Sequence, residues 1–235
     1  MLLLNFAFSI VYVINVDGDI DAGTYQYISR GINIAEKNGA ELIIKLNTDG
    51  GSLEYTNRIV EKIENSNIKI VTWVAPKGAH AFSAGVFILL SSDIAIMADG
   101  TTIGACQPVY IESGRIVPAE EKVQKAYAAK LSSIAEEHNR NKTAAYMFVM
   151  ENLAVSDNDA INMKIVDMKA NSMKEILNYL GEDRAIYIQR EVGEKFRSLI
   201  TDPMISYLLL SLGTLLLIFG LLSPGIYPES IGTIM

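Results

Sequence analysis

The sequence predicts an α/β domain with a largely parallel sheet, followed by a transmembrane helix. Two observations predict the domain: short β-branched runs alternate with segments of helical periodicity, and glycine-rich or polar turns separate them. Strands that alternate with helices pair in parallel, because each crossover helix packs on a face of the sheet. One long uncharged apolar stretch near the end of the chain predicts the membrane helix.

The expected strands are apolar runs that end at turn residues, and the expected helices repeat apolar residues every three or four positions. The first helix places Ile28 and Ile32 on one face and ends at Gly39, a usual residue after a helix. Strands are expected at 10–16, 42–46, 68–75, 94–97 and 165–168. Helices are expected at 24–38, 53–65, 118–137, 143–152 and 172–180, with a hairpin or flap at 111–117. Ligands of such sheets bind at the carboxyl ends of the strands.

The membrane helix is expected at residues 204–222, which contain no charged side chain. At about 1.5 Å per residue, the length of this helix is close to the thickness of the hydrocarbon core of a membrane, which is about 30 Å. The alternative is a buried core helix. The remaining boundaries are a soluble domain at 10–183, a charged linker at 184–203, the start of a truncated membrane region at 223–235, and a signal-peptide remnant or lead-in at 1–9.

Composition excludes several classes of function. The net charge of −7 and the lack of a basic stripe argue against a nucleic-acid partner. Cys106 is the single cysteine and there are two histidines, so the chain has no internal disulfide and no metal-ligand spacing, and no cofactor is expected. Half of the residues are apolar, which is consistent with contact with membrane lipid.

Ser83 is the strongest candidate for chemistry. It stands among Ala and Gly, after the apolar run 68–75 and before the apolar run 86–90, which predicts a strand-to-helix turn. Backbone N–H groups in the first turn of a helix are unpaired, and they can stabilise an oxyanion that develops beside a nucleophile. The alternative is that Ser83 is only an N-cap or a small packing residue.

Four ordered motifs then resemble a known family. They are Asn-Thr-Asp-Gly-Gly at 47–51, Ala-Pro-Lys-Gly-Ala-His-Ala-Phe-Ser-Ala-Gly at 75–85, Ile-Ala-Ile-Met-Ala at 94–98 with Thr-Ile-Gly-Ala at 102–105, and Asn-Arg-Asn at 139–141. Together they resemble the NfeD-type membrane-bound serine proteases, which are related to signal peptide peptidase A and to the proteolytic subunit of Clp protease. The resemblance covers nearly the whole chain and implies a ClpP/crotonase-like α/β fold with a Ser–Lys dyad.

The resemblance also implies roles for individual residues. Ser83 matches the nucleophile, Lys122 matches the general base, and Gly51 and Ala84 match the positions whose N–H groups form the oxyanion hole. The chain departs from the pattern at Asp49, where relatives usually carry proline before the paired glycines. Because of this change, the family pattern does not predict the stiffness or the charge of the loop.

The identity of the base has alternatives. A lysine can accept the serine proton only in its neutral form, and the start of a helix favours that form. Glu120 and Glu121 stand beside Lys122 and oppose neutrality unless they point to solvent. Lys122 is otherwise a solvated lysine in the first turn of a helix, and His80 is the rival base.

The resemblance implies a membrane-anchored endopeptidase that forms homodimers or larger homo-oligomers, with its protease domain outside the cytoplasm. Its expected substrates are apolar segments, including the C-terminal region of stomatin-like membrane proteins, bound in a groove lined by Phe82, Val86 and Phe87. The alternative function is a catalytically inactive module of the same fold that binds or scaffolds a stomatin-like partner.

Overall fold

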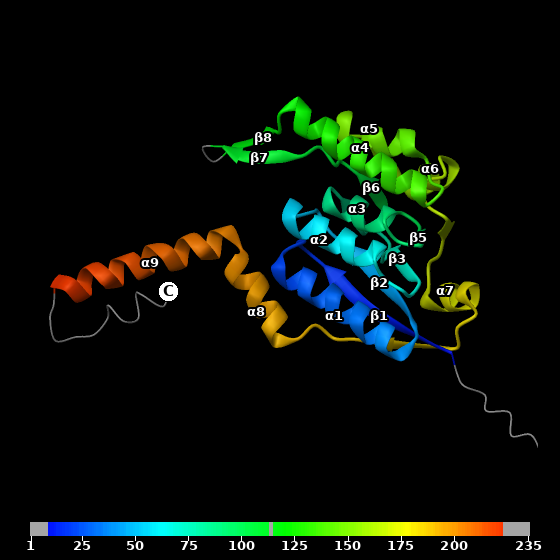
Figure 1. Cartoon of the computed structure of the whole chain (residues 1–235), viewed down its shortest axis with the longest axis horizontal. Helices are drawn as coiled ribbons and strands as arrows, with labels where there is room; N and C mark the ends of the chain where they lie inside the picture. The colour runs from blue at the N-terminus through cyan, green and yellow to red at the C-terminus, as the bar shows by residue number, and fades with distance from the viewer. Residues whose placement is uncertain (1–8, 113–114, 223–235) are drawn as a thin grey trace, which may run out of the picture. The chain divides into compact units, whose positions relative to one another are not determined.

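A six-stranded sheet forms the centre of the computed structural model, which describes residues 9–112 and 115–222 (Figure 1). The strand order is β10-β5-β3-β2-β1-β11, and every neighbouring pair runs parallel. The strands are β1 (Ile10–Asp17), β2 (Glu41–Asn47), β3 (Ile70–Val74), β5 (Ile94–Met97), β10 (Met168–Lys169) and β11 (Arg184–Tyr187). The prediction of a largely parallel sheet is confirmed.

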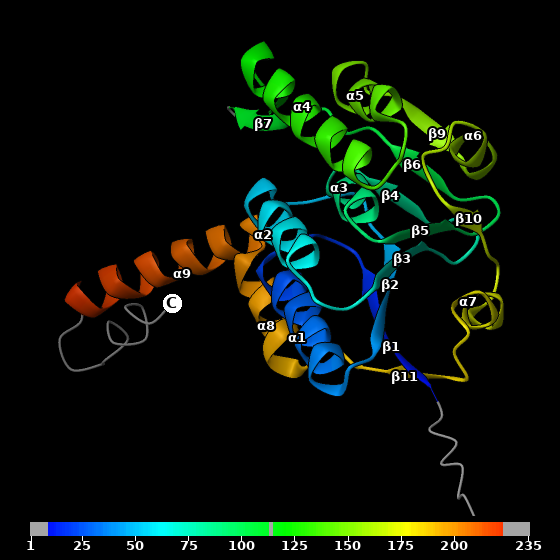
Figure 2. The same cartoon turned by 45° about the vertical axis from the view of Figure 1, so that its right-hand side comes forward.

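Alternate side chains of the strands enter two separate hydrophobic cores, as the period of two along a strand requires. On one face, Ile14 and Ile44 pack beneath α1 (Ala22–Asn38), α2 (Leu53–Glu64) and α3 (Ala84–Leu90). On the other face, Val13 and Ile43 pack with Ile176 of α7 (Met173–Leu180). Figure 2 shows α1 and α2 on one side of the sheet and α7 on the other.

A smaller layer lies beyond the central sheet. Three strands, β4 (His80–Phe82), β6 (Thr102–Gly104) and β9 (Ala154–Ser156), form a second sheet in the order β4-β6-β9. The helices of this part are α4 (Glu121–Glu137), α5 (Lys142–Met150) and α6 (Asp157–Asn162), and an antiparallel hairpin joins β7 (Val109–Glu112) to β8 (Arg115–Pro118). The sequence analysis missed the second sheet, because three-residue strands show too little periodicity to detect.

The start of α4 differs from the expectation. Pro118 was expected in the first turn of the helix, but it ends strand β8 and pairs there with Val109. Proline tolerates the edge of a sheet because its missing N–H is not needed there. The helix therefore begins at Glu121, and Lys122 remains in its first turn.

Beyond Arg190 the chain forms a second compact unit with α8 (Val192–Thr201) and α9 (Pro203–Leu222). Helix α9 is long and apolar enough to cross a membrane, with a mean hydropathy of 2.3, and only 11% of its most apolar stretch is buried, which argues against a core helix. The segment expected as a charged linker contains β11, whose Ala185 pairs with Val11 of β1, and α8. The expectations for residues 1–8 and 223–235 lie outside the described residues.

Candidate active site

The Gly50–Gly51 loop follows β2 and passes so close to its neighbours that side chains do not fit. A Cβ atom on Gly50 would lie 2.7 Å from the Cβ of Ser83, and one on Gly51 would lie 2.3 Å from the carbonyl oxygen of Ile20. Both glycines also have positive φ angles, 125° and 152°, which side chains disfavour. The paired glycines are therefore required by contact with Ser83 on one side and Ile20 on the other.

Ser83 lies between β4 and α3, in the strand-to-helix turn that the sequence predicts. Its φ of 49° and ψ of −112° lie outside the usual regions for a side-chain-bearing residue, which costs about 1–3 kcal/mol. It is the N-cap of α3, but its side chain makes no capping hydrogen bond. The hydroxyl is thus not engaged in the role that the N-cap interpretation assigns to it.

Backbone hydrogen bonds join the glycine loop to β4. The N–H of Thr48 donates to the carbonyl oxygen of His80 at 2.8 Å, and the N–H of Phe82 donates to the carbonyl oxygen of Thr48 at 3.0 Å. The buried Thr48 hydroxyl also accepts the N–H of Gly50 at 3.0 Å. These bonds fix the distance between the glycine loop and the residue that precedes Ser83.

Two N–H groups at this junction keep their hydrogen-bonding capacity. Within the described residues, neither the N–H of Gly51 nor that of Ala84 has an acceptor, whereas the N–H of Ser83 donates to the carbonyl oxygen of Gly104 at 3.0 Å. Ala84 is the first residue of α3, so its N–H belongs to the positive end of that helix. Acyl transfer requires a nucleophilic hydroxyl, such as that of Ser83, and nearby N–H donors for the oxyanion, such as those of Gly51 and Ala84.

Lys122 is not brought to Ser83 in this structure. Its ammonium forms an ion pair with Glu120 at 2.8 Å (Nζ–Oε2), and its side chain is 79% exposed. Lys122 therefore lies in solvent, as a solvated lysine in the first turn of α4. The role of Lys122 stays a prediction.

His80 contacts Asp49 and Phe82. Its Nε2 lies 2.8 Å from Oδ1 of Asp49, and its ring stacks on Phe82 with 4.6 Å between the ring centroids. Within the described residues it forms no hydrogen bond with Ser83. Asp49, the departure from the family pattern, thus ties the glycine loop to β4 through a side-chain pair.

Two further residues support the nucleophile turn and escaped sequence reasoning. The buried Cys106 thiol donates to the carbonyl oxygen of Ser83 at 3.5 Å, and burial raises the pKa of this thiol. Arg140 donates to the carbonyl oxygen of Leu90, the last residue of α3, at 2.6 Å and forms an ion pair with Asp167. Arg140, the central residue of the Asn-Arg-Asn motif, therefore supports the helix that Ser83 begins. A buried arginine that satisfies a helix C-terminus cannot be recognised from residue spacing alone.

The predicted groove lining is partly wrong. Val86 and Phe87 are 0% and 3% exposed and belong to the main core, because both point from α3 into the space beneath the helices. Phe82 is half-buried and remains at the surface beside His80. Among residues 9–112 and 115–222, no group of three His, Cys, Asp or Glu side chains is placed to hold a metal ion.

Comparisons with known proteins agree with this geometry. The membrane-bound protease PH1510 of Pyrococcus horikoshii is 36% identical over 250 residues, which cover 97% of this chain and 56% of the relative. The membrane protein NfeD1b of Bacillus subtilis is 27% identical over 92% of this chain and 52% of its own. The chain thus spans about half the length of the curated relatives it matches.

Solved structures show the same fold. Two structures of the 1510-N membrane-bound stomatin-specific protease are 32% identical to this chain. A serine-to-alanine mutant has a TM-score of 0.74, and the match covers 79% of this chain and 100% of that one. A lysine-to-alanine mutant in complex with a substrate peptide has a TM-score of 0.78, and the match covers 83% of this chain and 99% of that one. ClpP1 from Listeria monocytogenes, at 17% identity, has a TM-score of 0.52 over 70% of this chain and 94% of its own, which shows the fold alone. The expected ClpP-like fold is confirmed. The model of the NfeD1b N-terminal domain matches residues 10–185, and the chain belongs to that family.

Proposed function

We propose that this chain is the protease part of a membrane-anchored serine endopeptidase with Ser83 as its nucleophile. The observation that carries the proposal is the turn at Ser83, where an unbonded hydroxyl in a strained backbone lies against Gly50 and beside the free N–H of Ala84. Strained residues with free functional groups are typical of active sites. Relatives that are named proteases support the same assignment.

The proposed reaction is acyl transfer. Oγ of Ser83 attacks the scissile carbonyl carbon while its proton passes to the neutral amine of Lys122. The oxyanion accepts hydrogen bonds from the N–H groups of Gly51 and Ala84, and the C–N bond then breaks as the amine leaves with a proton from Lys122. Water attacks the acyl-serine by the same route in reverse, which restores Ser83 and releases the second product.

This mechanism requires Lys122 to move. The ammonium must leave Glu120, lose its proton and approach Ser83. A lysine-to-alanine mutant of a relative has been solved with a substrate peptide, which supports a lysine as a catalytic residue in this family. Binding of substrate or of another subunit would supply the free energy for the movement.

Apolar peptide segments are the proposed substrates. The β7–β8 hairpin begins three residues after Cys106, whose thiol contacts Ser83, and it exposes the apolar side chains of Val109, Tyr110 and Ile116. Burying two or three substrate side chains against such a surface would contribute a few kcal/mol at about 25 cal/mol per Å². One relative is described as specific for a stomatin homolog, and we extend that substrate class to this chain.

The proposed setting is a membrane. Helix α9 has the length and composition of a membrane span, and PH1510 is named a membrane-bound protease. We place the protease domain outside the cytoplasm and propose a homodimer or larger homo-oligomer, since ClpP-like relatives share the fold. Cysteine labelling of Cys106-free variants that carry single surface cysteines, in intact cells, would show on which side the domain lies.

A second function, an inactive module that scaffolds a stomatin-like partner, is favoured by the exposed ion pair of Lys122 with Glu120. A serine-reactive fluorophosphonate separates the two functions. The full chain in detergent is treated with the probe, and the labelled peptide is located by mass spectrometry. A protease is labelled at Ser83, whereas an inactive module that is folded and soluble is not labelled there.

A further inference from the structure

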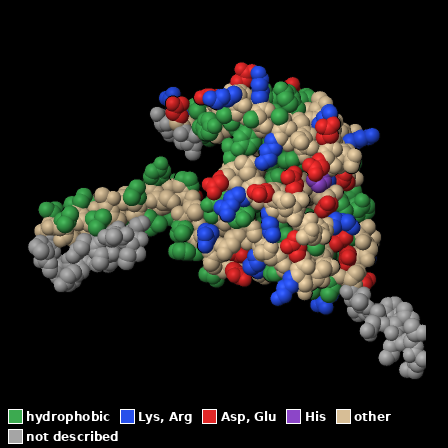
Figure 3. All heavy atoms as spheres, in the orientation of Figure 1, with side chains coloured by type: hydrophobic (Ala, Val, Ile, Leu, Met, Phe, Trp, Pro, Cys, Tyr) green, Lys and Arg blue, Asp and Glu red, His purple; other side chains and the backbone are tan. Residues whose placement is uncertain are grey.

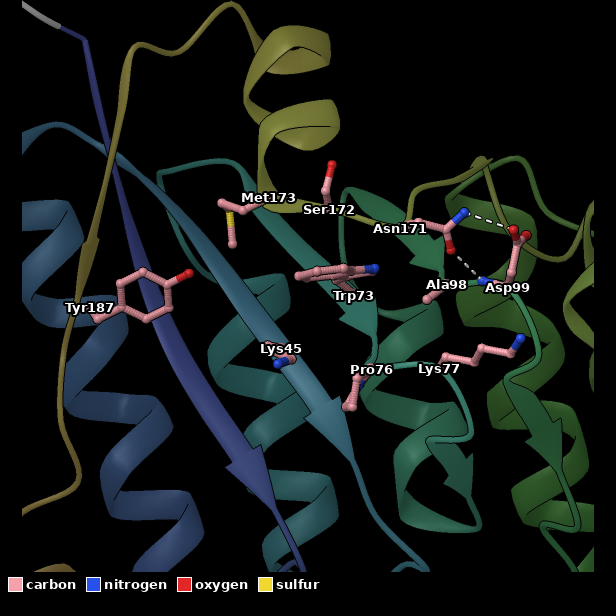
Figure 4. A pocket seen from close by; sticks show the side chains of 10 residues that line it. All are labelled: Lys45, Trp73, Pro76, Lys77, Ala98, Asp99, Asn171, Ser172, Met173 and Tyr187. Atoms are coloured by element: carbon pink, nitrogen blue, oxygen red, sulfur yellow. Dashed lines mark hydrogen bonds between the residues drawn. The ribbon is translucent and has the colours of Figure 1, made fainter.

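A second cavity lies on the other face of the sheet from Ser83, and its lining does not belong to the proposed active site. It has a volume of about 550 Å³, within the range of small-molecule sites. Its floor includes Trp73 of β3 and Lys45 of β2, and its rim includes Lys77, Tyr187 and Met173. Figure 4 shows Trp73 between the start of α7 and the two lysines.

Lys45 is unusual for its position. Strand β2 is otherwise apolar from Leu42 to Leu46, as expected for a strand buried on both faces. Lys45 interrupts this run at the carboxyl end of the strand, the end at which parallel sheets bind their ligands. Burying the ammonium group of a lysine at this position costs free energy of desolvation unless a partner is present.

Neither lysine of the cavity forms an ion pair within the described residues, although the charge of Asp99 attracts Lys77. Nζ of Lys45 lies 5.7 Å from the centroid of the Trp73 ring and forms no ion pair, and Lys77 forms none either. The one carboxylate in the lining, Asp99, is already engaged: Lys169 lies 2.6 Å from its Oδ1, and Asn171 donates to its Oδ2 at 2.7 Å. These hydrogen bonds lower the pKa of Asp99, so it stays charged and bound to its own partners.

Trp73 has a fixed ring, whereas Tyr187 is exposed at the opening. Trp73 is 6% exposed, and its indole N–H donates to the carbonyl oxygen of Ala170 at 2.9 Å, which fixes the ring. Tyr187 is 53% exposed and stands at the opposite side of the opening (Figure 4). A flat ring could enter between the exposed tyrosine and the lysine-bearing wall.

From this cavity we infer a binding site for a small aromatic anion of the size of a nucleoside monophosphate. The ammonium group of Lys45 binds the phosphate, because lysine is a common point-charge partner for phosphate, and Lys77 adds positive charge elsewhere in the lining. The ring packs against Tyr187 and the exposed edge of Trp73. The site is independent of the proposed proteolysis, since it lies on the α7 face of the sheet.

Trp73 is the single tryptophan of the sequence, so its emission reports on this cavity alone. The full chain in detergent is titrated with adenosine 5′-monophosphate under excitation at a wavelength that adenine does not absorb. We expect a saturable change in emission, at least about tenfold weaker binding for adenosine and for ribose 5-phosphate, a similar loss with Lys45→Gln and a smaller loss with Lys77→Gln. Lys37→Gln, on α1 at the other face, is the matched control and should bind as the unchanged protein does.

Equal binding of the nucleotide and adenosine, or of the nucleotide and ribose 5-phosphate, would overturn the proposal, because charge or ring recognition would be missing. No saturable change with the nucleotide, or unaltered affinity in both lysine variants, would overturn it as well. Thermal unfolding of each variant, measured without ligand, shows whether a loss of binding comes from a loss of folded protein.

Discussion

Replacing Thr48 with valine tests how the glycine loop is held. Thr48 is 1% exposed, and its hydroxyl accepts the Gly50 N–H at 3.0 Å and donates to the Gly50 carbonyl at 3.2 Å. Valine has nearly the same shape but leaves a buried N–H without a partner, which costs about 1–3 kcal/mol. We expect Thr48→Val to lower the free energy of unfolding by that amount.

The same change should lower kcat much more than it alters KM for the substrate. Without the Thr48 hydroxyl, Gly50 is free to shift, and the N–H of Gly51 moves from the position it needs to bind the oxyanion. Loss of one such donor lowers kcat by about 10²–10³-fold, which corresponds to roughly 2.7–4 kcal/mol. KM for an apolar peptide should change little, because the interaction is made in the transition state.

Thr72→Val is the matched control. Thr72, on β3, is also fully buried, and its hydroxyl forms a hydrogen bond with that of Ser92, which follows α3. Urea unfolding and steady-state peptide cleavage are measured for both variants, and the control should lose stability while it keeps kcat. If Thr48→Val loses stability but retains the kcat of the control, the glycine loop does not position an oxyanion donor.

Three further predictions concern the base, the support of α3 and a half-buried histidine, His138. Lys122→Ala should lower kcat by several orders of magnitude while His80→Ala lowers it little, and the reverse order in a peptide-cleavage assay would favour histidine as the base. Arg140→Met should lower the free energy of unfolding by about 3–5 kcal/mol, because it breaks a buried ion pair. The control Arg58→Met removes an exposed ion pair and should lower it by at most about 1 kcal/mol. Urea titrations measure both values. Burial, followed by the charge of Arg140, lowers the pKa of His138 from 6.5. The unfolded chain therefore binds more protons at mildly acidic pH, and stability should decrease as the pH falls below about 6.5, less so in His138→Gln.

The sequence predicts the central sheet well because its strands are long β-branched runs between clear turns. The first strand was expected at 10–16 and is Ile10–Asp17, and the fourth was expected at 94–97 and is Ile94–Met97. Strand β4 leads into the nucleophile turn and forms a sheet with β6 and β9, yet each of these strands has three residues. Tertiary pairing, rather than local propensity, forms strands of that length.

The site was predictable where it depends on backbone geometry. Paired glycines and a lone serine before a helix are local signals, and the structure brings Gly50 against Ser83. The position of Lys122 was not predictable, because it depends on a competing ion pair with Glu120 and on the hairpin before α4. The inward direction of Val86 and Phe87 also escaped prediction, since a seven-residue helix that is apolar on all sides gives no periodicity to read.

Cleavage by Ser83→Ala tests the central claim most directly. The full chain in detergent is incubated with a peptide that contains an apolar segment, and products are quantified by mass spectrometry beside the unchanged protein and an exposed-serine control, Ser133→Ala. Circular dichroism and thermal unfolding establish that each variant is folded. We predict that Ser83→Ala yields no product above background while Ser133→Ala cleaves as the unchanged protein does. Full cleavage by folded Ser83→Ala would contradict the assignment of the nucleophile and, with it, the proposed mechanism.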